Sequence, residues 1–193
     1  MFVFLLRCVN IVHLTLAHLL RPFPVFLQRK EFEQKNFTDV ESKPWDHSIA
    51  VDWCFHCSSE GEFEQLRPLI DYCLAHSRPI EIIYTSPSVE RRIKNFSHAH
   101  SDLIRSLRLP LITPFKLSNW SRAHGLIMCR YDFFASLLLL PVKKRLLIWA
   151  SLKGKGDSWW WHNLYRYFDL VVAATREQRR RILNLGVDED KLL

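Results

Sequence analysis

From residue 48 onward, short apolar runs alternate with segments of helical periodicity, and this alternation constrains the fold more than any other feature of the sequence. Branched and aromatic residues dominate the runs, which favours β-strands. Strands that alternate with helices predict a mostly parallel sheet covered by helices on both faces. We therefore expect an α/β, Rossmann-like domain over residues 48–193. Its expected strands are Ile49–Cys57, Ile80–Thr85, Leu109–Thr113, Leu126–Cys129, Leu146–Ala150 and Asp169–Ala173.

The helical segments between these runs carry apolar residues at three- and four-residue spacing. One apolar face begins at Phe63 and a second begins at Val89, whereas Phe133–Leu140 is apolar all round, as in a buried helix. The last helix is expected after Thr175, which forms a capping-box pattern with Gln178. In parallel sheets with such covering helices, ligands bind beyond the carboxyl ends of the strands.

The stretch Asp52–Ile70 contains a Cys-x-x-Cys pair, Cys54 and Cys57, which suggests a thiol redox protein. However, both cysteines precede the expected helix start at Ser59. Two residues three apart in a strand point to opposite faces and lie about 10 Å from each other, which is too far for a disulfide. We expect both cysteines to be small core residues and keep the redox function as the weaker alternative.

The same stretch contains Ser59-x-Gly61-Glu62, and Ser59 and Glu62 form a capping-box pattern that predicts a helix start. Gly61 allows the backbone to turn tightly or to approach a ligand closely. Glu62 is then expected at the first turn of a helix, beyond the carboxyl end of a strand. A glutamate at this position is more often a helix cap than a catalytic group.

Residues 1–30 are expected to form an amphipathic helix, followed by a polar linker over residues 31–47. A polar stripe interrupts the apolar segment, which favours a helix that lies in a membrane interface. A helix packed on its own domain and a single-span anchor are the alternatives. On a helical wheel, the polar residues Arg7, Asn10, His13, His18 and Arg21 lie opposite Phe4, Leu5, Cys8, Val12, Leu16 and Leu19.

The formal net charge of the 193-residue chain is +7, with a pI of about 9.3, which favours an anionic partner. The basic residues are spread along the chain without a nucleic-acid-binding motif, so nucleic acid is not an expected partner. No spacing of Cys and His residues is typical of a zinc site. An anionic membrane surface is the expected partner.

Several motifs follow one another in the order and spacing of a known enzyme family. "SSEGEFEQLRPLI" is followed by "IIYTSPS", "LPLITPF", "CRYDFFASLL", "LLIWASLKGKG" and "YFDLVVAATREQRRRILNLGV". This series resembles the N-terminal domain of the 3-deoxy-D-manno-octulosonic acid (Kdo) transferases, which add Kdo to lipid A precursors. The resemblance implies the acceptor-side half of an inverting GT-B glycosyltransferase of lipopolysaccharide biosynthesis. It implies CMP-Kdo as donor substrate, a lipid A precursor as acceptor, and no cofactor or metal.

The resemblance also implies roles for single residues. Glu62 would be the general base, and Ser59, Gly61, Arg130 and Asp132 would bind the acceptor. The family is anchored to the cytoplasmic face of the bacterial inner membrane, which agrees with the expected N-terminal helix.

The sequence departs from the family pattern at several positions. Arg130 occupies the position of an acidic residue, Phe134 and Ala135 replace a Trp-Pro pair, and Trp149 occupies the position of an asparagine. The donor-binding C-terminal domain of the family has no counterpart in these 193 residues, so we expect transfer to require a separate domain. The alternative function is a non-catalytic, membrane-associated module that binds lipid or sugar or acts as a scaffold.

Overall fold

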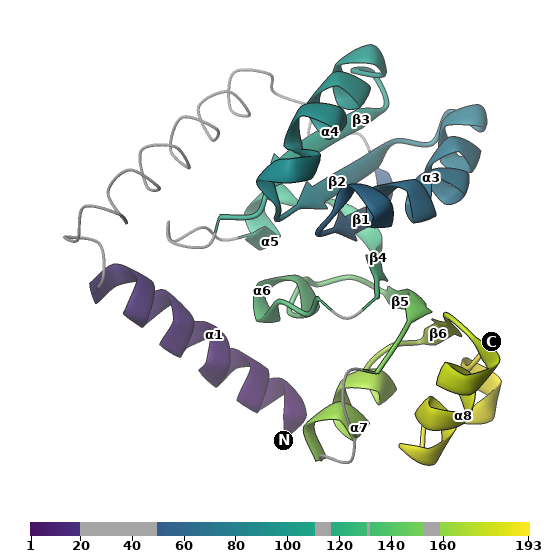
Figure 1. Cartoon of the computed structure of the whole chain (residues 1–193). Coiled ribbons are helices and arrows are strands. Elements are labelled where there is room, and N and C mark those ends of the chain that lie inside the picture. The colour runs from purple at the N-terminus through teal and green to yellow at the C-terminus, as the bar shows by residue number, and fades with distance from the viewer. Residues whose placement is uncertain (20–49, 111–116, 131, 153–158) are drawn as a thin grey trace.

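The computed structural model describes residues 1–19, 50–110, 117–130, 132–152 and 159–193. Their centre is a six-stranded sheet in which every pair of neighbouring strands is parallel, in the order β3-β2-β1-β4-β5-β6 (Figure 1). The expected α/β, Rossmann-like fold is therefore confirmed. The strands are β1 (Val51–Cys57), β2 (Ile80–Tyr84), β3 (Ile104–Arg108), β4 (Ala123–Cys129), β5 (Lys144–Ala150) and β6 (Leu170–Ala173).

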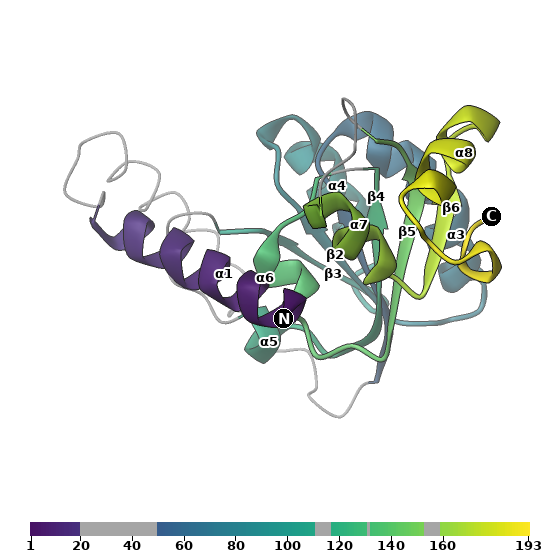
Figure 2. The same ribbon diagram turned by 90° about the horizontal axis from the view of Figure 1, so that it is seen from below.

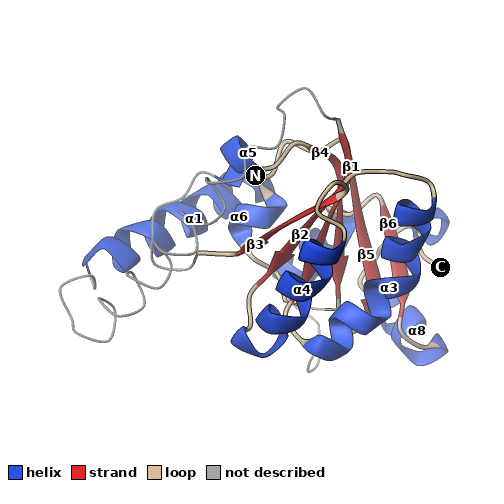
Figure 3. Cartoon of the chain, turned by 90° about the horizontal axis from the view of Figure 1, so that it is seen from above, coloured by secondary structure: helices blue, strands red, loops and turns tan. Residues whose placement is uncertain are grey.

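Helices cover both faces of the sheet and divide the core into two clusters of buried side chains (Figure 3). One face packs against α3 (Glu60–Ala75) and α4 (Pro87–Ala99), whose apolar faces begin at Phe63 and Val89 as expected. The other face packs against α1 (Phe2–Leu19), α5 (Leu117–Trp120), α6 (Ala135–Leu138), α7 (Trp159–Arg166) and α8 (Arg176–Asn184). A short 3-10 helix, Glu189–Lys191, precedes the last residues.

Five strands lie at their expected positions to within three residues at either end, but the expected third strand, Leu109–Thr113, is wrong. The edge strand β3 lies earlier, at Ile104–Arg108, and Leu109 and Pro110 follow it; residues 111–113 lie outside the described part of the chain. An edge strand is covered on fewer sides, so β3 carries Arg105 and Arg108 and lacks the continuous apolar run of a central strand. Because of this composition, β3 is not recognisable as a strand from the sequence.

The apolar run Phe133–Leu140 is a helix only over Ala135–Leu138, so the expectation of a longer buried helix is wrong. Phe133 instead packs against the rings of Trp161, Tyr165 and Phe168. The run is apolar because aromatic packing, and not one long helix, buries its first residues. The capping expectation at the last helix is confirmed, since Thr175 Oγ1 accepts a hydrogen bond from Gln178 N at 3.1 Å.

Helix α1 lies beside α6 and packs on the domain through Leu6, which is 1% exposed and belongs to the core (Figure 2). Its exposed side chains include most of the expected apolar face, namely Phe4, Leu5, Val12, Leu16 and Leu19. No helix in the described ranges is both long and apolar enough to cross a membrane. The remainder of the expected 1–30 helix and the expected linker 31–47 lie outside the described residues.

A buried ion pair fastens the turn after α5 to the amino end of the sheet. Glu81 of β2 is fully buried and pairs with Arg105 of β3, whose guanidinium lies over the Trp120 ring. The Glu81 carboxylate also accepts hydrogen bonds from Ser121 Oγ at 2.5 Å and from Arg122 N at 2.7 Å. With this number of donors, the buried charge is satisfied on both oxygens.

We expect Glu81→Ala to lower the free energy of unfolding by about 3–5 kcal/mol, because it leaves the Arg105 charge buried without its partner. Urea denaturation measures this loss. The control is Asp71→Ala, which removes an exposed ion pair with Arg67 and should cost about 1 kcal/mol or less. A loss below about 1 kcal/mol at Glu81 would contradict a buried, fully desolvated pair.

Candidate functional site

The strand order reverses between β1 and β4, which makes the carboxyl ends of these two strands the switch point of the sheet. The connections after β1 and after β4 lead away in opposite directions, and in open α/β sheets the crevice between two such connections is where ligands bind. Glu62 follows β1 in the first turn of α3, and Arg130 and Asp132 follow β4. The fold therefore brings together three of the residues that the sequence predicted for one site.

Glu62 is only 4% exposed, and its carboxylate folds back onto the turn before the helix. Its Oε2 accepts a hydrogen bond from Ser58 N at 2.6 Å, while Ser59 Oγ accepts one from Glu62 N at 3.3 Å. The expected capping box is thus half correct: Ser59 caps the helix, but Glu62 binds Ser58 and not the N-cap residue. Oε1 of Glu62 has no hydrogen-bond partner among the described residues.

Burial raises the pKa of Glu62 above the ordinary glutamate value. The hydrogen bond from Ser58 opposes this shift, the nearby negative charge of Asp132 adds to it, and the positive charge of Arg130 reduces it. A carboxylate with a raised pKa is a stronger base once it is ionised. The arrangement is therefore suited to accepting a proton on Oε1 from a hydroxyl group placed in the crevice.

The side chain of Arg130 reaches the same side of the sheet as α3. Its Nε donates to Gln65 Oε1 at 3.1 Å, and Cys129 Sγ lies 3.4 Å from the same oxygen. Successive residues of a regular strand point to opposite faces. Arg130 escapes this rule because its φ is +63°, a left-handed conformation that costs an ordinary residue about 1–3 kcal/mol.

A second residue with positive φ lies on the neighbouring strand. Trp149 has a φ of +54° and is 43% exposed, at a register shift between Leu147 and Ala150 where β5 pairs with β6. Strained backbone of this kind persists only where the surrounding structure enforces it, and it is found most often at functional sites. Arg130 and Trp149 lie at carboxyl ends of strands near the switch point, whereas Ser77, the third described non-glycine residue with positive φ, lies between α3 and β2.

Gly61 lies inside the first turn of α3, and its φ is not in the left-handed region. A Cβ atom at this position would have nothing within 4 Å. The expectation that Gly61 is needed for a tight turn is therefore wrong, because the helix begins one residue earlier, at Glu60. The open space above Gly61 leaves the second expected role, close approach of a ligand, as a prediction.

Cys54 and Cys57 are both strand residues, as expected, and both are buried free thiols. Cys54 belongs to the core cluster on the α6 side of the sheet and Cys57 to the cluster on the α3 side. Burial raises the pKa of both thiols. With the sheet between them and neither thiol activated, this pair has the environment of core residues.

Sequence reasoning missed Ser58, Gln65 and Thr85. Thr85 Oγ1 donates to Ser58 Oγ at 2.9 Å and ties the turn after β2 to the turn after β1. Gln65 positions Arg130 from the second turn of α3. A serine, a threonine and a glutamine are common at such positions, so only the three-dimensional contacts distinguish them. Among the described residues, no group of three His, Cys, Asp or Glu side chains is placed to hold a metal ion.

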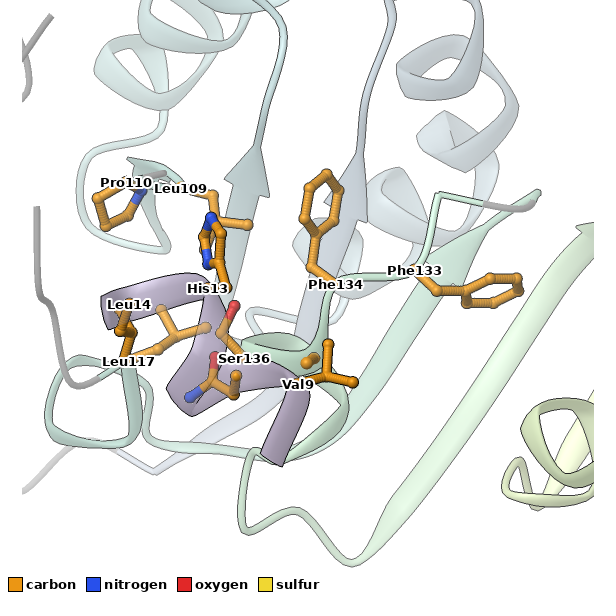
Figure 4. Close-up of a pocket in the computed structure, with 11 residues that line it drawn as sticks. Val9, His13, Leu14, Leu109, Pro110, Leu117, Phe133, Phe134 and Ser136 are labelled. Atoms are coloured by element: carbon orange, nitrogen blue, oxygen red, sulfur yellow. The ribbon is translucent and has the colours of Figure 1, made fainter. Parts of the chain in front are cut away.

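An apolar cavity of about 310 Å³ lies on the other face of the sheet, between α1 and the segment before α6 (Figure 4). Its lining includes Val9 and His13 of α1 together with Leu109, Phe133 and Phe134. None of the residues expected to form the site lines this cavity. The cavity is therefore separate from the site around Glu62 at the carboxyl ends of β1 and β4.

His56 is buried beneath this cavity-lining segment, with its ring centroid 5.5 Å from that of Phe134. Neither ring nitrogen has a hydrogen-bond partner among the described residues. Its strand neighbours in register, Ile83 and Met128, are apolar and buried. Burial consequently lowers the pKa of His56 from 6.5 to about 3, so the ring is neutral in the folded protein.

We expect this histidine to destabilise the fold in acid. Between pH 6.5 and about 3 the unfolded chain protonates His56 and the folded chain does not, so the free energy of unfolding falls as the pH falls. The slope from this one group approaches about 1.4 kcal/mol per pH unit. His56→Leu should remove that part of the slope in a series of urea titrations.

The matched control is His98→Leu, at an exposed histidine of α4, which should reproduce the pH dependence of the wild type. Parallel curves for the wild type and His56→Leu would contradict a neutral, buried ring.

The fold and the site together define the protein as a parallel α/β protein with a buried carboxylate, Glu62, at the switch point of the sheet. Comparison of the chain with models of known protein families and with curated proteins gave no match in either case.

Proposed function

We propose that this chain is the acceptor-side domain of a glycosyltransferase that moves Kdo from CMP-Kdo to a lipid A precursor. The observation that carries the proposal is the position of Glu62, a desolvated carboxylate at the switch point, one oxygen of which has no hydrogen-bond partner in the described part of the chain. The order of motifs that resemble the Kdo transferases supports the same reaction. We place the domain at the cytoplasmic face of the bacterial inner membrane.

In the proposed reaction, Oε1 of Glu62 takes the proton from an acceptor hydroxyl. The hydroxyl oxygen attacks the anomeric carbon of Kdo as the bond from that carbon to CMP breaks, which inverts the configuration. The Ser58 hydrogen bond fixes Oε2, so the remaining oxygen is the one presented to the acceptor. General-base catalysis of this kind contributes about 10²–10⁴-fold to rate.

The acceptor is bound by the groups around Glu62. The proposed contacts are Arg130 and Asp132 after β4, and the turn from Ser59 to Gly61, above which a bound molecule has open space. In the proposal, the donor site comes from a separate C-terminal domain, and the reaction needs no metal or cofactor.

We expect Glu62→Gln to lower kcat for Kdo transfer by about 10²–10⁴-fold, measured with a donor-binding domain supplied in trans. Because burial raises the pKa of Glu62, wild-type activity should fall on the acid side at a pH above the ordinary value of 4.5. Below that pKa the carboxyl group is protonated and cannot act as a base.

The control is Glu64→Gln, an exposed glutamate on the same helix that pairs with Arg92 and should retain activity. The Glu62→Gln protein should unfold at the same or a higher temperature at pH 7, since a buried carboxylate with a raised pKa destabilises the fold once it is ionised. Activity within twofold of the wild type in Glu62→Gln would refute the assignment of the base.

A second candidate function is a non-catalytic, membrane-associated module that binds lipid or sugar. The exposed apolar face of α1 favours it: Phe4 is 70% exposed and Ile11 61% exposed, and Trp159 lies close to the same end of the helix through its contact with Phe2. Exposed apolar side chains that gather on one helix face mark an interaction surface, even though the opposite face of α1 packs on the domain. Membrane association is also part of the first proposal, so binding and turnover must be measured separately.

We expect the double variant Phe4→Ser, Ile11→Ser to weaken binding to phosphatidylglycerol vesicles by at least about tenfold, because each side chain buries apolar surface worth about 1.5–3 kcal/mol. Vesicle co-sedimentation of the full chain measures the affinity. Leu69→Ser, which changes a 39% exposed apolar residue on α3, should bind as the wild type does. Equal binding by all three proteins would contradict docking through α1.

A further inference from the structure

Helix α1 turns part of its polar face towards the domain. Leu6 belongs to the buried core, and Asn10 and His13 follow it on the same side of the helix, at spacings of four and three residues. The other side of the helix carries the exposed apolar residues Phe4 and Ile11. A helix on the surface of a domain usually has the reverse orientation, with its apolar face inward. Packing on the domain alone does not account for the inward position of Asn10 and His13.

Asn10 and His13 line the cavity of about 310 Å³ between α1 and the domain, where a mostly apolar wall faces them. Leu109 and Phe134 belong to this wall, and in Figure 4 the His13 side chain extends from α1 towards Leu109. Ser136 of α6 adds one hydroxyl group to the lining. The cavity therefore combines an apolar wall with a few polar groups, as small-molecule sites do, whereas empty cavities are apolar throughout.

None of the three polar side chains of the lining has a hydrogen-bond or ion-pair partner among the described residues. The Asn10 carboxamide, the His13 imidazole and the Ser136 hydroxyl can each donate a hydrogen bond into the cavity. No carboxylate of the described residues lines it. A group of donors without an acidic neighbour favours an anionic oxygen ligand, because a hydrogen bond to a carboxylate is about twice as strong as one to a neutral oxygen.

The size of the cavity limits the molecule that it accepts. An apolar cavity of about 150 Å³ takes up benzene, so one of about 310 Å³ has room for about twelve non-hydrogen atoms, as in decanoate. A membrane lipid with several acyl chains is too large to be enclosed there. Size and lining together favour a short, single apolar chain that ends in a carboxylate.

We propose that this cavity binds a single-chain carboxylate of medium length, with the chain against the apolar wall and the carboxylate on Asn10, His13 and Ser136. The site is distinct from the one around Glu62, and the inference does not depend on the proposed glycosyl transfer. The head group contacts both α1 and α6, and the chain fills the gap between α1 and the domain. Because the ligand binds the docked form of the helix, its binding stabilises that form.

The test is a calorimetric titration of the full chain with decanoate and with butyrate, below the concentration at which decanoate forms micelles. Decanoate should bind at one saturable site and at least about a hundredfold more tightly than butyrate, which lacks most of the apolar contact. In ¹³C methyl spectra, decanoate should shift the signals of Leu109 and Leu117, which line the cavity. It should leave the signals of Leu69, an exposed residue of α3, unchanged.

Two sets of variants identify the cavity as the site. Val9→Trp, which fills the cavity from α1, should weaken decanoate binding by at least about tenfold, whereas Val12→Trp, at a 57% exposed residue outside the lining, should leave it unchanged. The double variant Asn10→Ala, His13→Ala should weaken binding by about tenfold or more, through the loss of hydrogen bonds to a charged group. Its control is Thr15→Ala, at an exposed polar residue of the same helix that does not line the cavity.

The absence of saturable binding by the wild type would overturn the inference, and so would similar affinities for decanoate and butyrate. Wild-type affinity in Val9→Trp would place the ligand outside the cavity and overturn it too. Loss of binding in Phe4→Ser, Ile11→Ser but not in Val9→Trp would show adsorption on the exposed face of α1 instead. Wild-type affinity in Asn10→Ala, His13→Ala would overturn the contacts with the carboxylate and, with them, the class of ligand.

Discussion

The parallel pairing of β1 with both β2 and β4 is the constraint on which the site depends. From β1 the chain continues to β2 on one side and later returns as β4 on the other side, so the connections after β1 and β4 run to opposite faces of the sheet. Glu62 and Arg130 therefore lie near each other at the carboxyl ends of β1 and β4, although they are far apart in the sequence. The burial that makes β1 the centre of the core also desolvates the first turn of α3, and so raises the pKa of Glu62.

Two polar arrangements at opposite ends of the sheet differ in how well their charges are compensated. At the amino end, Glu81 has Arg105, Ser121 and a backbone N–H to compensate its charge. At the carboxyl end, one oxygen of Glu62 has no partner among the residues that the structure describes, and Arg130 has an unfavourable φ. The first arrangement stabilises the fold, and the second costs stability and supplies reactive groups. This contrast is the physical reason to place function at the carboxyl end.

Much of the fold could be predicted from the sequence, because buried parallel strands are apolar runs and helix starts have side-chain caps. The prediction failed at β3, where an edge strand carries arginines, and at Phe133, where aromatic packing imitates a buried helix. At the site, the Ser59 cap predicted where Glu62 lies, and its proposed role as a base came from the resemblance of this turn to the Kdo transferases. The left-handed backbone of Arg130 has no signal in the sequence, since arginine rarely adopts it, and Gln65 is identified only by the contact it makes.

In the proposed function, the Glu62 carboxylate is a desolvated base within reach of a ligand. A ¹³C NMR titration of the Glu62 carboxyl carbon in the intact chain, with and without a lipid A precursor, tests this proposal. We expect a midpoint above the ordinary value of 4.5 in the free protein and a further change of that signal when the acceptor binds. A midpoint at or below 4.5, with no response to the acceptor, would contradict it.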